Sequence, residues 1–300
     1  MTILHDHRRC PLPVVLAGVL LIAATAAAQE KVDRTLAAAA DGTVIIENLG
    51  GEVMVTGWDR DEVHLTGTLD DQVEELVFER DGDRVRIKVE YPRRSTRIEG
   101  SYLQVQVPRG SRLDVRTVSA EVGVRDVRGR IEAQTVSGDV EVAGEPAEVE
   151  VQTVSGDVDV TARSPRVRVQ SVSGDLHLDG ARGDVSAETV SGEITLVGGG
   201  FDRLETSSVS GDLEFRGELN RGGTFIFDSH SGDVVLVLGG DLNAEFQVET
   251  FSGDIENVFG AKTQRRSKFA PGRELEFTVG DGDARVRVKS FSGDVHLKRR

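Results

Sequence analysis

The residues that could do chemistry in this sequence belong to one short motif, Thr-Val-Ser-Gly-Asp-Val, which recurs with small variations. Each copy brings a hydroxyl, a glycine and a carboxylate together. Its serines are Ser119, Ser137, Ser155, Ser173, Ser191, Ser210, Ser231, Ser252 and Ser292. Because an active site is singular and this motif is repeated, the pattern indicates a structural element and identifies no catalytic residue.

The acid two residues after each serine forms a column of carboxylates if the repeats stack. The column comprises Glu121, Asp139, Asp157, Asp175, Glu193, Asp212, Asp233, Asp254 and Asp294. Neighbouring charges about 5 Å apart repel by about 1 kcal/mol at the dielectric constant of water, so something must offset them. We expect turn chemistry, in which the carboxylate accepts backbone N–H groups. The alternative is Ca²⁺ shared between repeats, with the seven aspartates of the column as ligands.

The glycine of the motif is the second element of this turn. These glycines are Gly138, Gly156, Gly174, Gly192, Gly211, Gly232, Gly253 and Gly293. We expect them to supply the positive φ of a tight turn. Calcium β-roll repeats carry G-G-x-G-x-D on both turns of an 18-residue repeat, whereas here one turn per repeat carries a single glycine. The comparison favours turn chemistry over calcium, and no other cofactor is expected.

A second column of hydroxyls lies two residues before the motif serine. It comprises Thr117, Thr135, Thr153, Ser171, Thr189, Ser208, Ser229, Thr250 and Ser290. The alternation of apolar and polar residues loses its phase here, so the sequence leaves open whether these side chains face inward or outward. We expect hydrogen bonds to nearby backbone. An outward hydroxyl face, as in ice-binding solenoids, is the alternative.

Histidine and nucleotide chemistry find little support. The sequence contains no His-Glu-x-x-His, Walker or dinucleotide-binding motif. We expect His177 and His296 to face solvent, because they lie between apolar positions, and His230 to be packed, because it replaces the valine of other repeats. A polysaccharide-active enzyme with carboxylates contributed across repeats remains an alternative function. Any sugar-stacking aromatic is expected near the N-terminus, at Trp58, Tyr91 or Tyr102.

The elements that position these columns follow from the repeat. Successive serines are 18, 18, 18, 18, 19, 21, 21 and 40 residues apart, and Phe269–Phe277 is expected to fill the last gap as a degenerate repeat. Apolar residues alternate with polar ones on both sides of Ser-Gly-Asp, as at Val149, Val151, Val158 and Val160. One repeat cannot bury its apolar side alone, whereas stacked repeats form a continuous core. We predict an all-β solenoid of two-strand rungs; an antiparallel meander is the alternative.

The remaining segments divide the chain. Residues 1–28 predict a cleaved signal peptide, with Arg8 and Arg9 before an uncharged apolar stretch and Ala26-Ala27-Ala28 at its end. Residues 29–112 predict an N-terminal β cap and 113–300 the solenoid, with 29–300 one continuous domain. No later segment is long and apolar enough to span a membrane. The basic residues within 261–273 predict a solvated loop, with a partner-binding loop as the alternative.

Composition narrows the partners. The chain has 36 Lys and Arg against 51 Asp and Glu, a net charge of −15. This acidity argues against nucleic acid or an anionic membrane as the main partner. The single cysteine, Cys10, excludes disulfides within the chain, iron–sulfur clusters and cysteine-based zinc sites.

The sequence resembles the bacterial "putative adhesin" (GIN-like) family of exported β-solenoid domains of unknown function. The resemblance is carried by Asn48–Trp58, Val107–Gly110, the Ser-Gly-Asp repeats and the segment from Gly282 to Val295. It implies a role in adhesion, and some relatives occur in envelope-stress signalling settings. It implies no catalytic residue.

Together these features predict an exported, non-enzymatic scaffold that presents side chains at regular intervals. Its expected location is the periplasm or cell surface of a bacterium. Its expected partner is an envelope protein or a surface polysaccharide. A protein-binding component of envelope-stress sensing is the alternative without catalysis.

Overall fold

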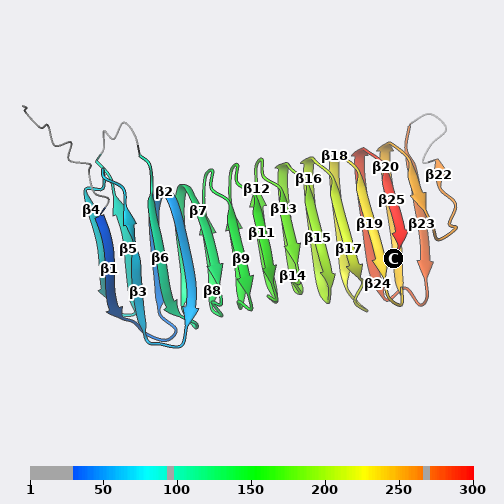
Figure 1. Ribbon diagram of the computed structural model, residues 1–300. Helices are drawn as coiled ribbons and strands as arrows, with labels where there is room; N and C mark the ends of the chain where they lie inside the picture. The colour runs from blue at the N-terminus through cyan, green and yellow to red at the C-terminus, as the bar shows by residue number, and fades with distance from the viewer. Residues whose placement is uncertain (1–29, 93–97, 266–270) are drawn as a thin grey trace, which may run out of the picture.

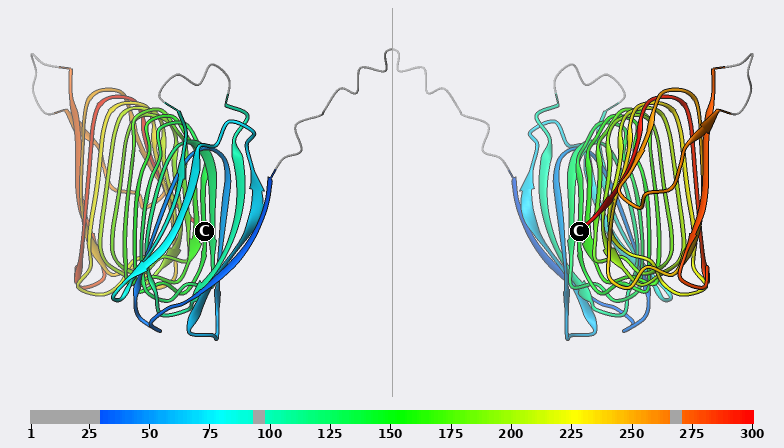
Figure 2. Two further views of the ribbon diagram at one scale, coloured as in Figure 1. Left: turned by 90° about the vertical axis from the view of Figure 1, so that its left-hand side faces the viewer. Right: turned by 90° about the vertical axis from the view of Figure 1, so that its right-hand side faces the viewer.

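The computed structural model describes residues 30–92, 98–265 and 271–300. Within them the chain forms strands only, wound as a long solenoid (Figure 1). Viewed from its ends, the successive turns of chain superimpose around one elongated core (Figure 2). The predicted signal peptide, 1–28, lies outside the described residues. In the described part, no helix is long and apolar enough to cross a membrane.

Strands that precede the Ser-Gly-Asp turn stack as one parallel face, which we call the leading face. In stacking order they are β8 (Arg130–Gln134), β10 (Glu148–Gln152), β12 (Arg166–Ser171), β14 (Gly183–Ser191), β16 (Phe201–Ser210), β18 (Thr224–Ser231), β24 (Ala284–Ser292) and β20 (Ala244–Ser252). Like residues pair across neighbouring rungs, such as Val149 with Val167 and Val151 with Val169. This register is the one that the repeat spacing predicts.

Strands that follow the turn stack as the trailing face, also in parallel. In stacking order they are β9 (Val140–Gly144), β11 (Val158–Ala162), β13 (Leu176–Asp179), β15 (Ile194–Gly199), β17 (Leu213–Glu218), β19 (Val234–Gly239), β25 (Val295–Arg299) and β21 (Ile255–Asn257). Parallel pairing throughout the repeats excludes the antiparallel meander and confirms the solenoid.

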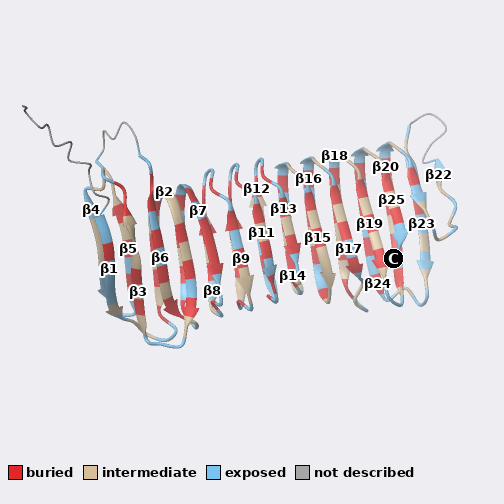
Figure 3. Ribbon diagram, in the orientation of Figure 1, coloured by how far each residue is buried: buried red, intermediate tan, exposed pale blue. Residues whose placement is uncertain are grey.

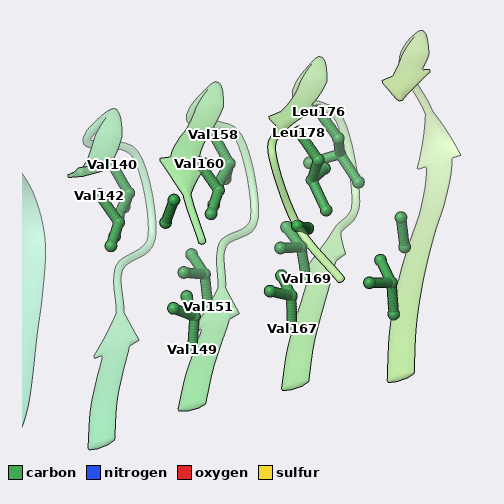
Figure 4. Packing of buried hydrophobic residues seen from close by; sticks show 14 of the residues in the cluster. Val140, Val142, Val149, Val151, Val158, Val160, Val167, Val169, Leu176 and Leu178 are labelled. Carbon is green, nitrogen blue, oxygen red and sulfur yellow. The ribbon is translucent and has the colours of Figure 1, made fainter. Parts of the chain in front are cut away.

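The two faces enclose one core of aliphatic columns. Val149 and Val151 of the leading face project toward Val158 and Val160 of the trailing face, and the same arrangement recurs along the stack (Figure 4). All four are at most 1% exposed. The alternation of buried and exposed residues along each strand is visible over the whole solenoid (Figure 3).

Phenylalanines fill the core where the repeats lengthen to 21 residues. Phe215 packs against Phe201, Phe225 and Phe227 at ring-centroid distances of 5.7–6.3 Å. These rings are at most 1% exposed, so aromatic packing replaces the aliphatic columns at this point of the core.

The N-terminal end adds rungs outside the motif. Strand β2 (Thr43–Trp58) turns a corner and lies parallel to β7 (Arg112–Arg125) on both sides of it. Strands β5 (Arg84–Glu90) and β6 (Ser101–Pro108) together form the next rung outward on β2. The segment 29–112 therefore contributes stacked rungs as well as a cap.

Antiparallel strands close this end of the stack. Strand β4 (Glu75–Asp81) covers β5, β3 (Glu62–Leu69) covers β6, and β1 (Glu30–Ala37) pairs with β3. Antiparallel strands cannot continue the parallel stack, so they terminate its open edge.

The C-terminal end departs from sequence order. The last rung, β24 and β25, inserts between the β18/β19 rung and the β20/β21 rung. Strand β23 (Arg273–Val279) lies antiparallel to β20, and the short β22 (Gln264–Arg265) pairs with β23.

The expected degenerate repeat at Phe269–Phe277 is therefore wrong. Residues 269 and 270 lie outside the described part, and Arg273–Val279 caps the stack instead of continuing it. The chain first forms the outermost rung with β20, then covers it with the antiparallel β23, and then forms β24 on the inner side of β20. For this reason Ser252 and Ser292 lie on adjacent rungs although they are 40 residues apart.

Candidate functional site

The corner that joins the two faces carries a continuous row of exposed apolar side chains, which we call the apolar ladder. It consists of the residue before each motif serine, together with Leu49. In stacking order the ladder is Leu49, Val118, Val136, Val154, Val172, Val190, Val209, His230, Phe291 and Phe251. Its six valines are 43–48% exposed. A contiguous row of exposed apolar side chains commonly marks an interaction site in soluble proteins.

Aromatic rings end the ladder at the C-terminal side. The ring of Phe291 lies parallel to His230 at 4.8 Å and to Phe251 at 4.9 Å between centroids. Phe251 and Phe291 are 46% and 48% exposed. His230 is exposed as well, so the expectation that it is packed in the core is wrong. The valine position that it occupies points outward in every rung.

The hydroxyl column, by contrast, faces inward. Its nine members, Thr117 to Ser290, are 3–7% exposed. The hydroxyls of Thr135, Thr153 and Ser171 accept the N–H of the motif glycine three residues later, at 2.8–3.1 Å. The expected local bonding to backbone is confirmed at these rungs, and this column is therefore not an outward hydroxyl face; the exposed hydroxyls of the turn are those of the motif serines.

The motif glycines are required for close stacking. A Cβ atom on Gly156 would lie 2.0 Å from the carbonyl oxygen of Gly138, and one on Gly174 would lie 2.0 Å from that of Gly156. Both glycines have negative φ, so the expected positive φ is wrong for them, whereas Gly211, Gly232 and Gly293 have positive φ of 144–159°. Their role is to let the turn of one rung approach the carbonyl of the rung below.

The acid column is a ladder of hydrogen bonds. One carboxylate oxygen of Asp139 accepts the backbone N–H of Asp157 at 2.9 Å, and Asp157 accepts that of Asp175 at 2.9 Å. The same bond recurs at 2.8 Å from Asp175 to Glu193 and from Asp212 to Asp233, and again among Asp233, Asp294 and Asp254. The expected turn chemistry therefore acts between rungs, where it offsets the repulsion of stacked carboxylates.

The end of the acid column receives a cation. Asp254 belongs to the outermost rung, so no further rung supplies it with an N–H group. Arg273 of the capping strand takes that place, with 2.5 Å between its guanidinium and the Asp254 carboxylate. This pair lies on the basic island expected at 261–273, of which Arg266 and Lys268 lie outside the described residues.

Calcium binding by the seven aspartates stays a prediction. Each carboxylate has one oxygen committed to a backbone N–H where the bonds above are formed. Among the described residues, no group of three or more His, Cys, Asp or Glu side chains is placed to hold a metal ion.

Two shallow grooves run along the leading face beside the apolar ladder. One, of about 460 Å³, is bordered by the ladder and by outward polar side chains three residues before each serine. Its polar border is Arg116, Gln134, Gln152 and Gln170. The second, of about 540 Å³, extends along the aromatic end and is bordered by Asp228, Glu249 and Lys289.

The trailing face carries a separate acidic groove of about 700 Å³. Its carboxylates are Glu52, Glu121, Asp139, Glu141, Asp157, Asp159 and Asp175, and His177 lies at its end. His177 and His296 are half-buried on the outer surface, and His296 contacts Glu256 at 3.1 Å. These two histidines lie on different rungs and do not meet.

The N-terminal aromatics are largely engaged. The Trp58 ring has the Arg60 guanidinium 4.8 Å from its centroid and His64 stacked at 6.0 Å. Tyr91 is half-buried, and its hydroxyl contacts that of Ser101 at 3.0 Å. Tyr102 is 50% exposed. The uncovered aromatic cluster thus lies at the opposite end from the one expected.

Two titratable groups tie the N-terminal cap together. Burial acts to raise the pKa of Asp70, but backbone N–H groups of Gln72, Gly100 and Glu99 donate to its carboxylate and hold the pKa below its ordinary value. A hydrogen bond to Asp33 at 2.8 Å raises the pKa of His64 and links β1 to β3.

Comparison with known proteins identifies the architecture. Residues 44–298 match the family model described as Toastrack DUF4097. No curated protein matches the sequence. The family match confirms the expected resemblance to an adhesin-like family of unknown function.

The solved structures that resemble this chain are distant from it in sequence. A "putative lipid binding protein" from Parabacteroides distasonis superimposes with a TM-score of 0.51 at 14% identity, over 89% of this chain and 97% of that one. A "putative adhesin" from Parabacteroides merdae gives a TM-score of 0.43 at 9% identity, over 89% and 96% of the two chains. The likeness to the Parabacteroides distasonis structure supports the fold, and at 14% identity it leaves the function open.

Sequence reasoning missed the apolar ladder itself. The signal was present, because alternation from Val149 and Val151 places Thr153 inward and Val154 outward. An apolar residue in a repeated motif is usually buried in the core, so the motif does not by itself identify its valine as a surface residue.

Proposed function

The chain belongs to the Toastrack DUF4097 family, and we propose that it is an exported, non-enzymatic interaction scaffold of the bacterial cell envelope. The observation that carries the proposal is the apolar ladder, one exposed side chain per rung along the length of the solenoid. A rigid core holds this row in a fixed register, so a partner meets a preformed surface and little ordering entropy is lost on binding.

The aromatic end is the part of the ladder best suited to a partner. Large aromatic side chains dominate binding energy in protein interfaces, and Phe251, Phe291 and His230 are the largest exposed members of the ladder. Their rings already stack on one another, which fixes their orientation before binding. The adjoining groove bordered by Asp228, Glu249 and Lys289 supplies polar groups that could orient a ligand.

Charge restricts the kind of partner. In every rung an acid follows the ladder residue by three positions, and the net charge is −15. These charges oppose an anionic membrane surface and nucleic acid. An envelope protein, or a surface polysaccharide bound through its apolar ring faces, fits this surface better.

The test is retention of envelope material by the immobilised protein. We expect an envelope fraction from the source bacterium to leave a protein or polysaccharide on the wild-type chain and not on Phe251→Ser/Phe291→Ser. The matched control is Val258→Ser, because Val258 is 63% exposed but lies off the ladder. Equal retention by the wild-type and double-variant proteins would contradict the role of the ladder, and no retention by any form would contradict the interaction function.

A further inference from the structure

We infer that the N-terminal half of the apolar ladder docks a second copy of this chain, side by side and in parallel. The surface consists of Val118, Val136, Val154 and Val172 with the groove bordered by Arg116, Gln134, Gln152 and Gln170. The inference rests on the proposed function, because it names one occupant of the ladder and leaves the aromatic end to the envelope partner.

The repeat distance of the ladder selects the occupant. Gln134, Gln152 and Gln170 pair in register on adjacent parallel strands, so the valines two residues after them recur once per strand, about every 4.8 Å. An extended peptide laid along the solenoid presents like-facing side chains only every two residues, about 6.6 Å, and soon falls out of phase. A second stack of β-strands has the same spacing, and rows of identical side chains then interdigitate in a dry interface.

The groove beside the ladder gives the relative orientation. It has a volume of about 460 Å³ and lies between the valine row and the glutamine row. A two-fold axis parallel to the solenoid places the valine row of each copy in the groove of the other. In an antiparallel pairing the grooves of the two copies would face each other and so would the two valine rows. The valines would then not enter a groove, and the copies would make less contact.

The charges beside the groove agree with this orientation and limit its extent. A parallel two-fold sets the arginine and glutamine border of one copy against the acid column of the other. From Arg116 to Gln170 that border contains no carboxylate. In the next rung the border residue is Glu188, so acid would face acid there. The border then continues, in stacking order, as Ser207, Asp228, Lys289 and Glu249. The contact therefore ends near Val172.

The first test is sedimentation equilibrium of the whole chain at physiological salt. We expect the mass to rise with concentration from the monomer value of 32.4 kDa toward twice that value. Val154→Asp/Val172→Asp should remain monomeric, while Val258→Asp should behave as wild type. All three substitutions are at side chains 43–63% exposed, so each variant is expected to melt with the wild-type protein.

The second test fixes the orientation. In a chain carrying Cys10→Ser, we expect a short bifunctional thiol cross-linker to join Val154→Cys between copies, because a parallel two-fold brings the two copies of this residue to the same level on facing sheets about 10 Å apart. Val258→Cys should not be cross-linked. A wild-type chain that is monomeric at every concentration, or a dimer unaffected by the double aspartate variant, would overturn the inference. Loss of envelope retention in Phe251→Ser/Phe291→Ser would still support the proposed function in that case.

Discussion

The carboxylate of Asp294 accepts the backbone N–H of Asp254 at 2.8 Å, although Asp254 comes 40 residues earlier in the chain. The two residues lie on adjacent rungs because the last rung of the chain, β24 and β25, lies on the inner side of the β20 and β21 rung, which precedes it in the sequence. The bond is the same one that joins Asp139 to Asp157 eighteen residues apart. Stacking, and not chain order, therefore determines which acids meet, and the bonds from Asp212 through Asp233 and Asp294 to Asp254 follow the stack through its reordered C-terminal end.

The acid column should stabilise the fold through its hydrogen bonds and not through its charge. Asp157→Ala removes the acceptor for the N–H of Asp175, and we expect a loss of about 1 kcal/mol in the free energy of unfolding. Asp157→Asn keeps an acceptor oxygen and removes one charge, so it should be close to wild type. Urea denaturation of the three proteins measures both effects. Equal losses of unfolding free energy in Asp157→Ala and Asp157→Asn would show that the charge of the carboxylate, and not its hydrogen bond, stabilises the fold.

Removal of divalent cations should leave the melting temperature unchanged. The backbone bonds already offset the repulsion between stacked acids, and no described group of acidic or histidine side chains is arranged to hold a metal. Thermal melts with Ca²⁺ and with excess chelator check this expectation. A midpoint several degrees higher in Ca²⁺ would restore the calcium hypothesis for the seven aspartates.

A side chain at a motif glycine should break the stack. In Gly156→Val the new Cβ would lie 2.0 Å from the carbonyl oxygen of Gly138, so the rungs must separate. We expect destabilisation of about 3 kcal/mol or more, at the upper end for overpacking. The control is Ser155→Ala in the same turn, whose exposed side chain makes no such contact. Differential scanning calorimetry that found the two variants alike would contradict this role of the glycine.

A matched pair of valines tests the two sides of the corner. Val158 is 1% exposed and Val154 is 43% exposed, four residues earlier. Val158→Asp buries a carboxylate in an aliphatic column, and we expect a loss of several kcal/mol or failure to fold. Val154→Asp should change the free energy of unfolding by no more than about 0.5 kcal/mol. Equal effects in chemical denaturation would mean that the assignment of inward and outward columns is wrong.

Asp70 should make the cap sensitive to acid. Its folded-state pKa lies below its ordinary value because three backbone N–H groups donate to the carboxylate. A lowered pKa contributes stability that is fully present above the ordinary value of 3.8 and is lost as pH falls through the folded-state value. The stability gap between wild type and Asp70→Asn should thus narrow as pH falls below about 4. Denaturation from pH 7 to pH 2 measures the gap, and a constant gap would contradict the assignment.

Much of the fold could be predicted from the sequence because every rung has to bury the same set of apolar positions against its neighbours. Aligning on the motif serine places Val149, Val151, Val158 and Val160 in columns, and all four are buried in the core as expected. The parallel register follows from the fixed spacing.

The order of rungs at the two ends could not be predicted in this way. β5 and β6 lie outside β2, and β24 and β25 lie inside β20 and β21, although rungs in either order would keep the same columns. The choice depends on which strand the antiparallel caps cover, a tertiary contact with no local signature.

The candidate site was predicted only in part. The acid column and its turn chemistry follow from Ser-Gly-Asp, but the apolar ladder depends on the direction of a single side chain at the corner. Thr153 looks suited to solvent and Val154 to the core, and the structure has them reversed. The hydroxyl can be buried because it accepts the N–H of Gly156 at 3.0 Å.

The most direct test of the account is the rate at which a thiol reagent labels a cysteine placed on the apolar ladder. In a chain carrying Cys10→Ser, Phe291→Cys and Val258→Cys should both react rapidly, since both positions are exposed. After addition of the envelope fraction, the account predicts slower labelling at position 291 and an unchanged rate at position 258. An unchanged rate at position 291, with envelope material demonstrably bound, would show that the partner binds elsewhere and would contradict the central claim.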